Sequence, residues 1–182
     1  MKIIDTFAVV EDSLYSLQYE HETLHEFAKC FELWNDPMYL REFFEEHLND
    51  LNHKFWNDIT IEEAIIKTRK DARQLENELL EIAETGKTER LETLSTLFEP
   101  LSEGIIEDFE KDKAKGLQRH SWLRIYAIRI EANLFIICGG AIKLTRTMNE
   151  RKHLLKELEK LEFTQDYLTD EADDNLDFVE II

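Results

Sequence analysis

The fold is decided by two neighbouring apolar runs, WLRIYAIRI at residues 122–130 and NLFIICGGAIKLTRT at residues 133–147. Both are rich in β-branched and aromatic residues, and only a Glu-Ala pair separates them, so they predict a long β-hairpin. Apolar residues occupy both faces of the first run, which indicates a central strand. Gly139 and Gly140 in the second run indicate a bulge or the close approach of another backbone.

A shorter hairpin is predicted at the N-terminus, where residues 4–10 and 13–19 are β-like runs joined by a Glu-Asp turn. Residues 21–110 then show the apolar spacing of helices. Within them, Asp36 before Pro37 is typical of the start of a helix. The middle of the chain is therefore predicted to be helical.

Capping and helix-ending residues set the limits of two helices in this region. Thr60 and Glu63 form a capping box that begins the longest helix, which Gly86 ends. A shorter helix is predicted over 88–98, before Pro100.

The C-terminal part predicts one more helix and an acidic tail. Leucines recur at helical spacing after Asn149, and an acidic segment then leads to residues 178–182, which are expected to form an edge strand or a docked tail.

These patterns predict an α+β fold. A small, mostly antiparallel sheet, built from the N-terminal hairpin and the Trp122–Thr147 hairpin, packs against several helices and is accompanied by a C-terminal helix. The chain is interpreted as a single domain, residues 1–182, whose parts are an N-terminal hairpin (1–20), a helical insertion (21–110), a basic hairpin with the C-terminal helix (111–170) and an acidic tail (171–182).

Positive charge is concentrated in one part of a chain whose net charge is −18. Residues 1–110 hold 10 Lys and Arg against 27 Asp and Glu, and residues 157–182 hold 1 against 10. Residues 111–156 reverse the sign, with 11 against 3. This asymmetry predicts a local anion-binding surface; the alternative is that these cations pair with the acidic remainder of the fold.

Metal and nucleotide chemistry have little support. Residues 21–25, HETLH, match the zinc motif HExxH, in which His21 and His25 would bind the metal and Glu22 would activate water. The motif lies at a helix start among other charged residues and has no HxxGxxH continuation, so a zinc hydrolase is only the third alternative. Five glycines form no phosphate-binding loop, and we expect no metal and no cofactor.

The sequence predicts a cytoplasmic protein with no membrane partner. It shows no signal peptide and no apolar run long enough to span a bilayer. Cys30 and Cys138 are far apart in sequence and are expected to be buried thiols, which fits a reducing compartment.

The candidate catalytic residues are the cations of the long hairpin, Arg124, Lys143 and Arg146. Long cations on a sheet can hold an RNA phosphodiester and stabilise the charge that develops when a ribose 2′-hydroxyl attacks it, without a metal. The alternative is a sheet edge with solvated or salt-bridged cations. The candidate RNA-binding residues are Arg119, Tyr126, Arg129, Arg151 and Lys152.

The segments 122–126, 134–138 and 142–147, followed directly by a helix, resemble the C-terminal half of RelE/ParE-superfamily toxins, especially the phage-derived HigB-like branch. The resemblance covers about residues 120–165. It implies a small antiparallel sheet packed on helices, mRNA cleavage, usually on the ribosome, and a protein antitoxin as partner, in many cases a helix-turn-helix protein.

Carried onto this chain, the resemblance assigns Arg124 to phosphate contact and Lys143 and Arg146 to the second basic motif. His153 and Tyr167 are candidates for a C-terminal catalytic residue, whereas His47 and His53 are expected to pack or cap.

The leading hypothesis is an RNase toxin of a toxin–antitoxin system, with a gyrase-directed toxin as a variant. The alternative is a non-enzymatic interaction protein on a RelE-like scaffold, whose acidic helices bind a partner.

Overall fold

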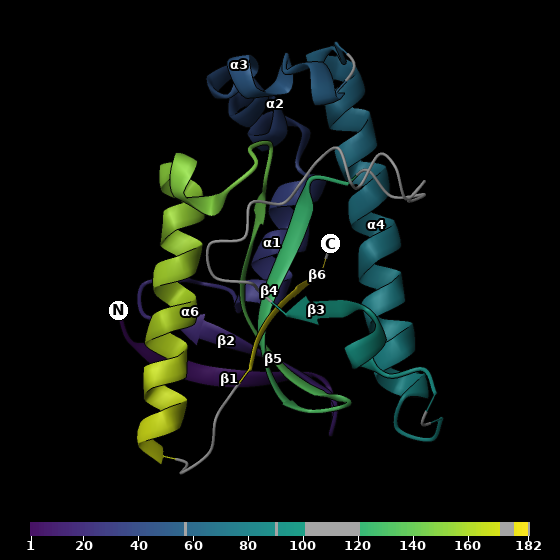
Figure 1. The fold of residues 1–182 in the computed structure, drawn as a ribbon, viewed down its shortest axis with the longest axis vertical. Helices are drawn as coiled ribbons and strands as arrows, with labels where there is room; N and C mark the ends of the chain where they lie inside the picture. The colour runs from purple at the N-terminus through teal and green to yellow at the C-terminus, as the bar shows by residue number, and fades with distance from the viewer. Residues whose placement is uncertain (57, 90, 101–120, 172–176, 182) are drawn as a thin grey trace.

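The computed structural model, which describes residues 1–56, 58–89, 91–100, 121–171 and 177–181, has a central sheet between helical layers (Figure 1). The order of its strands is β1-β2-β5-β4-β6-β3. Their bounds are Ile3–Val10 for β1, Leu14–Tyr19 for β2, Phe98–Pro100 for β3, Leu123–Glu131 for β4, Leu134–Ile142 for β5 and Asp177–Ile181 for β6. The α+β prediction is confirmed.

Both predicted hairpins are present. Strands β1 and β2 pair antiparallel, as do β4 and β5, but β2 and β5 join the hairpins in parallel, so the sheet is mixed. In the β4–β5 ladder Tyr126 pairs with Gly139 and Ala127 with Ile137, which leaves Cys138 as the extra residue of a bulge. The bulge predicted near Gly139 is confirmed.

Local capping explains where several helices begin. Asp36 precedes α2 and its Oδ1 accepts the backbone N–H of Met38 at 2.8 Å, and Thr60 and Glu63 form the predicted capping box of α4. The bounds of the α-helices are Glu26–Asn35 for α1, Pro37–Glu46 for α2, Leu48–Leu51 for α3, Ile61–Thr85 for α4 and Lys152–Glu171 for α6.

The helix predicted over 88–98 is wrong. In its place are a short 3₁₀ turn, Leu94–Thr96, and strand β3. Tertiary contacts override the helical spacing, because the backbone N–H of Leu94 donates to Asn133 Oδ1 at 2.9 Å and that of Ser95 donates to the Ala132 carbonyl at 3.1 Å.

The C-terminal segment was predicted to be an edge strand or a docked tail. It is a strand, but it does not lie at an edge of the sheet. Strand β6 pairs with both β4 and β3 and so lies inside the sheet. β4 therefore has a neighbour on each side, which confirms it as a central strand.

Each face of the sheet is covered by helices. Helices α1, α2 and α4 bury the larger apolar cluster on one face, and α6 buries a smaller one on the other (Figure 1). Along β4, Ile125 and Ala127 face the first cluster and Tyr126 and Ile128 the second, so every position of this part of the strand is apolar. No helix among the described residues is long and apolar enough to cross a membrane.

Candidate functional site

Two of the three predicted catalytic cations are buried. Arg124, in β4, is 7% exposed, and Lys143, directly after β5, is 6% exposed. The Arg124 guanidinium donates through Nη1 to the carbonyls of Ser121 at 2.8 Å and Leu123 at 2.9 Å. Its Nε is buried and has no hydrogen-bond partner among the residues that the structure describes. The expectation of an open basic sheet surface is therefore wrong at these two positions, because the hairpin is covered on both faces.

The predicted RNA-binding residues do not form one surface. Tyr126 is fully buried in the cluster beneath α6, so its assignment to RNA binding is wrong. Arg129 is exposed near the β4–β5 turn, whereas Arg151 and Lys152 lie at the start of α6. Arg119 is outside the described residues. The accessible cations are therefore divided between the two ends of the hairpin.

At the end of β5 the chain forms a hollow of about 140 Å³, which we call the β5 hollow. The segment after β5 contributes Arg146, which is exposed, and Thr145, while the region around α3 contributes Asp50 and His53. The other lining residues are Asn49, Phe55, Leu144 and Glu150. Residues about a hundred positions apart in sequence therefore converge beside one of the predicted catalytic cations.

A buried tryptophan fixes this convergence. Trp56 is 8% exposed, and its Nε1 donates to the Leu144 carbonyl at 3.1 Å. Its ring packs edge-on against Trp122, with 5.1 Å between centroids. The segment that carries His53 is therefore held against the end of the hairpin.

The carboxylates that line the β5 hollow already have partners. Asp50 forms a two-point ion pair with Arg151, whose Nε lies 2.7 Å from Asp50 Oδ2. This hydrogen bond lowers the pKa of Asp50 and raises that of Arg151. Glu150 accepts the backbone N–H and the hydroxyl of Thr147 at 2.8 and 2.9 Å.

His53 has a defined orientation in the hollow. Its Nδ1 accepts the backbone N–H of Phe55 at 3.3 Å, so in the neutral ring the proton is on Nε2. The prediction that His53 caps is therefore confirmed, and its Nε2–H can also donate to a bound group.

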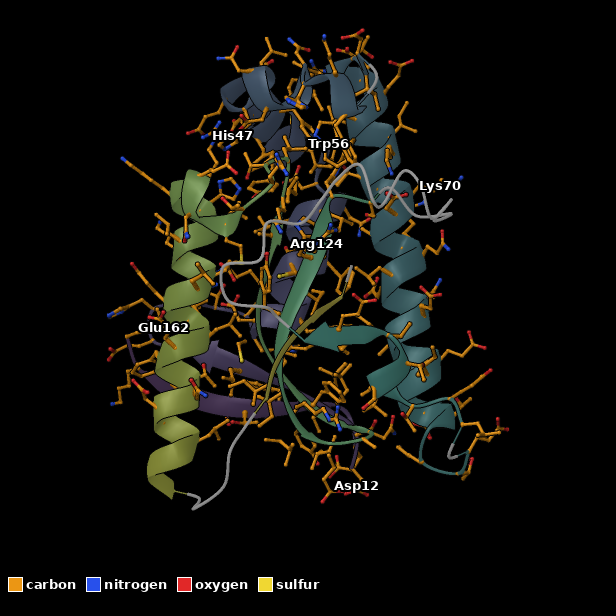
Figure 2. The ribbon with its side chains drawn as sticks, viewed as in Figure 1. Asp12, His47, Trp56, Lys70, Arg124 and Glu162 are labelled. Carbon is orange, nitrogen blue, oxygen red and sulfur yellow. The ribbon has the colours of Figure 1, made fainter. Side chains whose placement is uncertain are left out.

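Two more histidines lie against each other next to the hollow, with their rings tilted by 60°. The rings of His47 and His153 are 4.8 Å apart, and His47 Nδ1 is 3.7 Å from Asp50 Oδ2. His153 Nε2 donates to the Ile142 carbonyl at 3.0 Å, and burial lowers the pKa of His153. His153 is therefore neutral at pH 7, with an unprotonated Nδ1. Figure 2 labels His47 at the top of the molecule and Arg124 near its centre.

The HETLH motif does not have the helical geometry of a zinc site. Helix α1 begins at Glu26, and His25 is its N-cap, with Nδ1 accepting the Ala28 N–H at 3.4 Å. His21 has a φ of 72° and is exposed, so His21, Glu22 and His25 do not share a helical face. Within the described part of the chain, no group of three or more His, Cys, Asp or Glu residues is placed to hold a metal.

A buried ionic cluster, which the sequence did not predict, joins α6 to α1. The Lys160 ammonium lies 2.8 Å from Glu26 Oε2 and 2.8 Å from Glu157 Oε1. Glu157 Oε2 is buried without a hydrogen-bond partner among the described residues, and burial raises the pKa of Glu157 to about 7. The glycine pair was the available signal, because a Cβ at Gly139 would lie 1.9 Å from Glu157 Oε2.

The cluster lies beside the part of β2 and β5 in which the two strands are not paired. The β2–β5 ladder extends only from Leu14–Phe135 to Ser16–Ile137, so the two strands separate beyond it. The thiols of Cys30 and Cys138 lie in the same region and are buried, as predicted, and burial raises both of their pKa values.

Comparisons with protein-family models, with curated proteins and with solved structures find no match to this chain.

Proposed function

We propose that this protein is a RelE-like RNase toxin that cleaves mRNA without a metal, and that the β5 hollow is its reaction site. The observation that carries the proposal is the convergence of Arg146, His53 and Thr145 at the end of the hairpin that resembles the toxins. A cation and an imidazole N–H in one small hollow are suited to a phosphodiester, while the Thr145 hydroxyl donates to the Thr147 carbonyl at 2.9 Å and so orders the segment that carries Arg146.

The reaction is an attack of the ribose 2′-hydroxyl on the adjacent phosphorus, with loss of the 5′-oxygen and formation of a 2′,3′-cyclic phosphate. Arg146 stabilises the charge on the pentacoordinate phosphate. The Nε2–H of His53 forms a hydrogen bond to the leaving oxygen, which takes its proton from solvent water as the P–O bond breaks. His153, which is neutral and contacts His47 next to the hollow without lining it, is the imidazole that we assign to accept the 2′-hydroxyl proton through Nδ1.

In this proposal Arg124 and Lys143 support the hairpin instead of contacting RNA, because both are buried. Arg151 has a positioning role, since it holds Asp50 beside the histidines. The partners proposed are mRNA, on or off the ribosome, and a protein antitoxin, and the proposed location is the cytoplasm.

The test uses a labelled RNA in EDTA and compares two exposed arginines of the same hairpin. Arg146→Ala is expected to lower the cleavage rate by about 10²-fold, the cost of losing one charge-stabilising group. Arg129→Ala removes the same charge at the far end and should stay within about twofold, because it does not line the hollow. The product of the wild-type protein should carry a 2′,3′-cyclic phosphate.

Growth provides a second readout. Induced wild-type protein should arrest growth, and His53→Ala and Arg146→Ala should relieve the arrest while circular dichroism stays unchanged. If the wild-type protein neither cleaves RNA nor arrests growth, the proposal fails.

A second candidate is a non-enzymatic interaction protein that retains the hairpin as a scaffold. The burial of Arg124 and Lys143 favours it, since a scaffold needs neither residue exposed. It predicts that Arg146→Ala leaves every cellular effect unchanged, whereas the RNase proposal predicts that the effect is lost.

A further inference from the structure

The free edge of β1 is exposed. β1 is the outermost strand on its side (Figure 1), and residues 4–8 are all exposed, with Ile4 at 50% and Phe7 at 38%. Exposed edge strands with apolar side chains are templates for the addition of another strand. This edge therefore needs either local features that prevent the pairing of another strand or a partner that pairs with it.

The protection of this edge is partial. Register shifts occur between Ile3 and Asp5 and between Ala8 and Val10, so only residues 5–8 pair regularly with β2. The backbone N–H of Thr6 donates to Asp5 Oδ1 at 2.8 Å, so a local side chain satisfies it. An added strand could pair with about four residues here.

A groove adjoins the same edge. It has a volume of about 530 Å³, and its floor includes Ala8 and Val9 of β1 and Phe27 and Phe31 of α1. Phe7 stacks on His25 beside it, with 5.0 Å between ring centroids. The groove is therefore apolar at its base and continuous with the exposed strand.

The rim of the groove is acidic. Glu32 of α1 and Glu76 of α4 line it, and no Lys or Arg does so among the described residues. His25 also lines it, and burial lowers the pKa of His25, so this ring adds no positive charge at pH 7. An occupant with basic side chains is complementary to this rim.

We propose that the edge of β1 and its acidic groove bind an extended, basic segment of a partner protein by strand addition. The segment pairs with residues 5–8, inserts an apolar side chain between β1 and α1, and places Lys or Arg beside Glu32 and Glu76. A second copy of this chain is a poor occupant, because it carries the same acidic rim and a net charge of −18. This surface shares no residue with the β5 hollow, so the inference does not depend on the proposed RNase function.

The probe is an eight-residue peptide in which valine and lysine alternate, titrated into the full chain at about 0.15 M salt, where distant charges are screened. Binding is expected, with chemical-shift changes confined to residues 3–10, to α1 and to the part of α4 around Glu76. A peptide with glutamate in place of lysine should not bind. Equal binding of the two peptides, or no binding of the basic one, overturns the proposal.

Two variants separate a specific site from general attraction to an acidic protein. Glu32→Gln with Glu76→Gln should weaken binding about tenfold, whereas Glu45→Gln with Glu81→Gln removes the same charge from exposed helix positions and should change it less than about twofold. Thr6→Pro removes the edge N–H that the added strand would take over from Asp5 Oδ1, and it should abolish binding. Equal effects of the two charge pairs overturn the proposal, as does a native mass showing a dimer that Thr6→Pro converts to a monomer.

Discussion

The two faces of the central sheet are buried by different means. On the face of α1, α2 and α4, large apolar side chains such as Phe44 and Trp122 form one continuous cluster. On the face of α6, the apolar cluster is smaller, and the charged pair of Glu157 and Lys160 is buried beside it. Apolar packing does not depend on pH, whereas a buried carboxyl does. The first face therefore contributes most of the stability of the fold, and the face of α6 contributes more of its pH dependence.

The largest expected effect is on the apolar face. Trp122 is 1% exposed, donates through Nε1 to Thr68 Oγ1 at 2.9 Å, and meets the ring of Phe44 edge-on. Trp122→Ala should lower the free energy of unfolding by about 3–5 kcal/mol, because it leaves a large cavity and removes the N–H that the Thr68 hydroxyl accepts. Urea denaturation measures this loss. The control Ile66→Ala, at a position 68% exposed, should change it by less than about 0.5 kcal/mol, and equal losses would contradict the comparison.

The features that could be predicted from the sequence are those set by local contacts. Asp36 and Thr60 cap helices through hydrogen bonds to backbone groups within three residues, so a short stretch of sequence is enough to predict these helix starts. The β4–β5 hairpin likewise needs only a turn between two apolar runs. The apolar pattern of β4 also indicated correctly that it is a central strand.

The features that could not be predicted depend on distant contacts. Strand β6 pairs with β4 across about fifty residues, and nothing in its own sequence fixes that neighbour. In the candidate site, Arg146 was identified from the hairpin, but its position beside His53 depends on the anchoring of Trp56 to Leu144. Arg124 was predicted to be an accessible cation, but it lies on the same covered strand as the apolar residues of β4 and is buried with them.

The second prediction concerns the face of α6. Burial raises the pKa of Glu157 from its ordinary 4.5 to about 7, so between these values the folded protein keeps a proton that the unfolded chain has lost. Stability from this group is greatest below pH 4.5 and falls as the pH rises through about 7, by about 3 kcal/mol in total. Glu157→Gln cannot ionise, so this decline should be absent from the variant.

The measurement is the difference in unfolding free energy between the wild type and Glu157→Gln from pH 4.5 to 8. The difference removes other titrations, including that of His153, whose lowered pKa makes stability rise with pH up to 6.5. The control is Glu162→Gln, which is exposed on the outer side of the same helix (Figure 2). The wild type and this variant should show the same dependence of unfolding free energy on pH. A flat difference for Glu157→Gln as well would show that Glu157 is ionised throughout.

The smallest expected effect is at the start of α6, where the charge pair is only partly buried. Arg151 is 37% exposed and Asp50 12%, and a pair in this position contributes about 1 kcal/mol or less. Arg151→Gln should therefore lower stability by no more than this at pH 7, and added salt should reduce the difference. Lys152→Gln, one residue away and exposed, is the control and should have no measurable effect.

The pH dependence of this pair should have the opposite sign to that of Glu157. Arg151 lowers the pKa of Asp50 below its ordinary 3.8, so the stability from the pair is present above that value and is lost as the pH falls through the lowered pKa. The difference between the wild type and Arg151→Gln should therefore vanish in acid, and an NMR titration of the Asp50 carboxyl should show its pKa rising in the variant. If the difference instead grew as the pH fell, Asp50 would not be the partner that Arg151 stabilises. If both predictions hold, α6 responds to acid in two ways. Its buried carboxyl, Glu157, becomes more stabilising as the pH falls, whereas the partly exposed pair of Arg151 and Asp50 becomes less so.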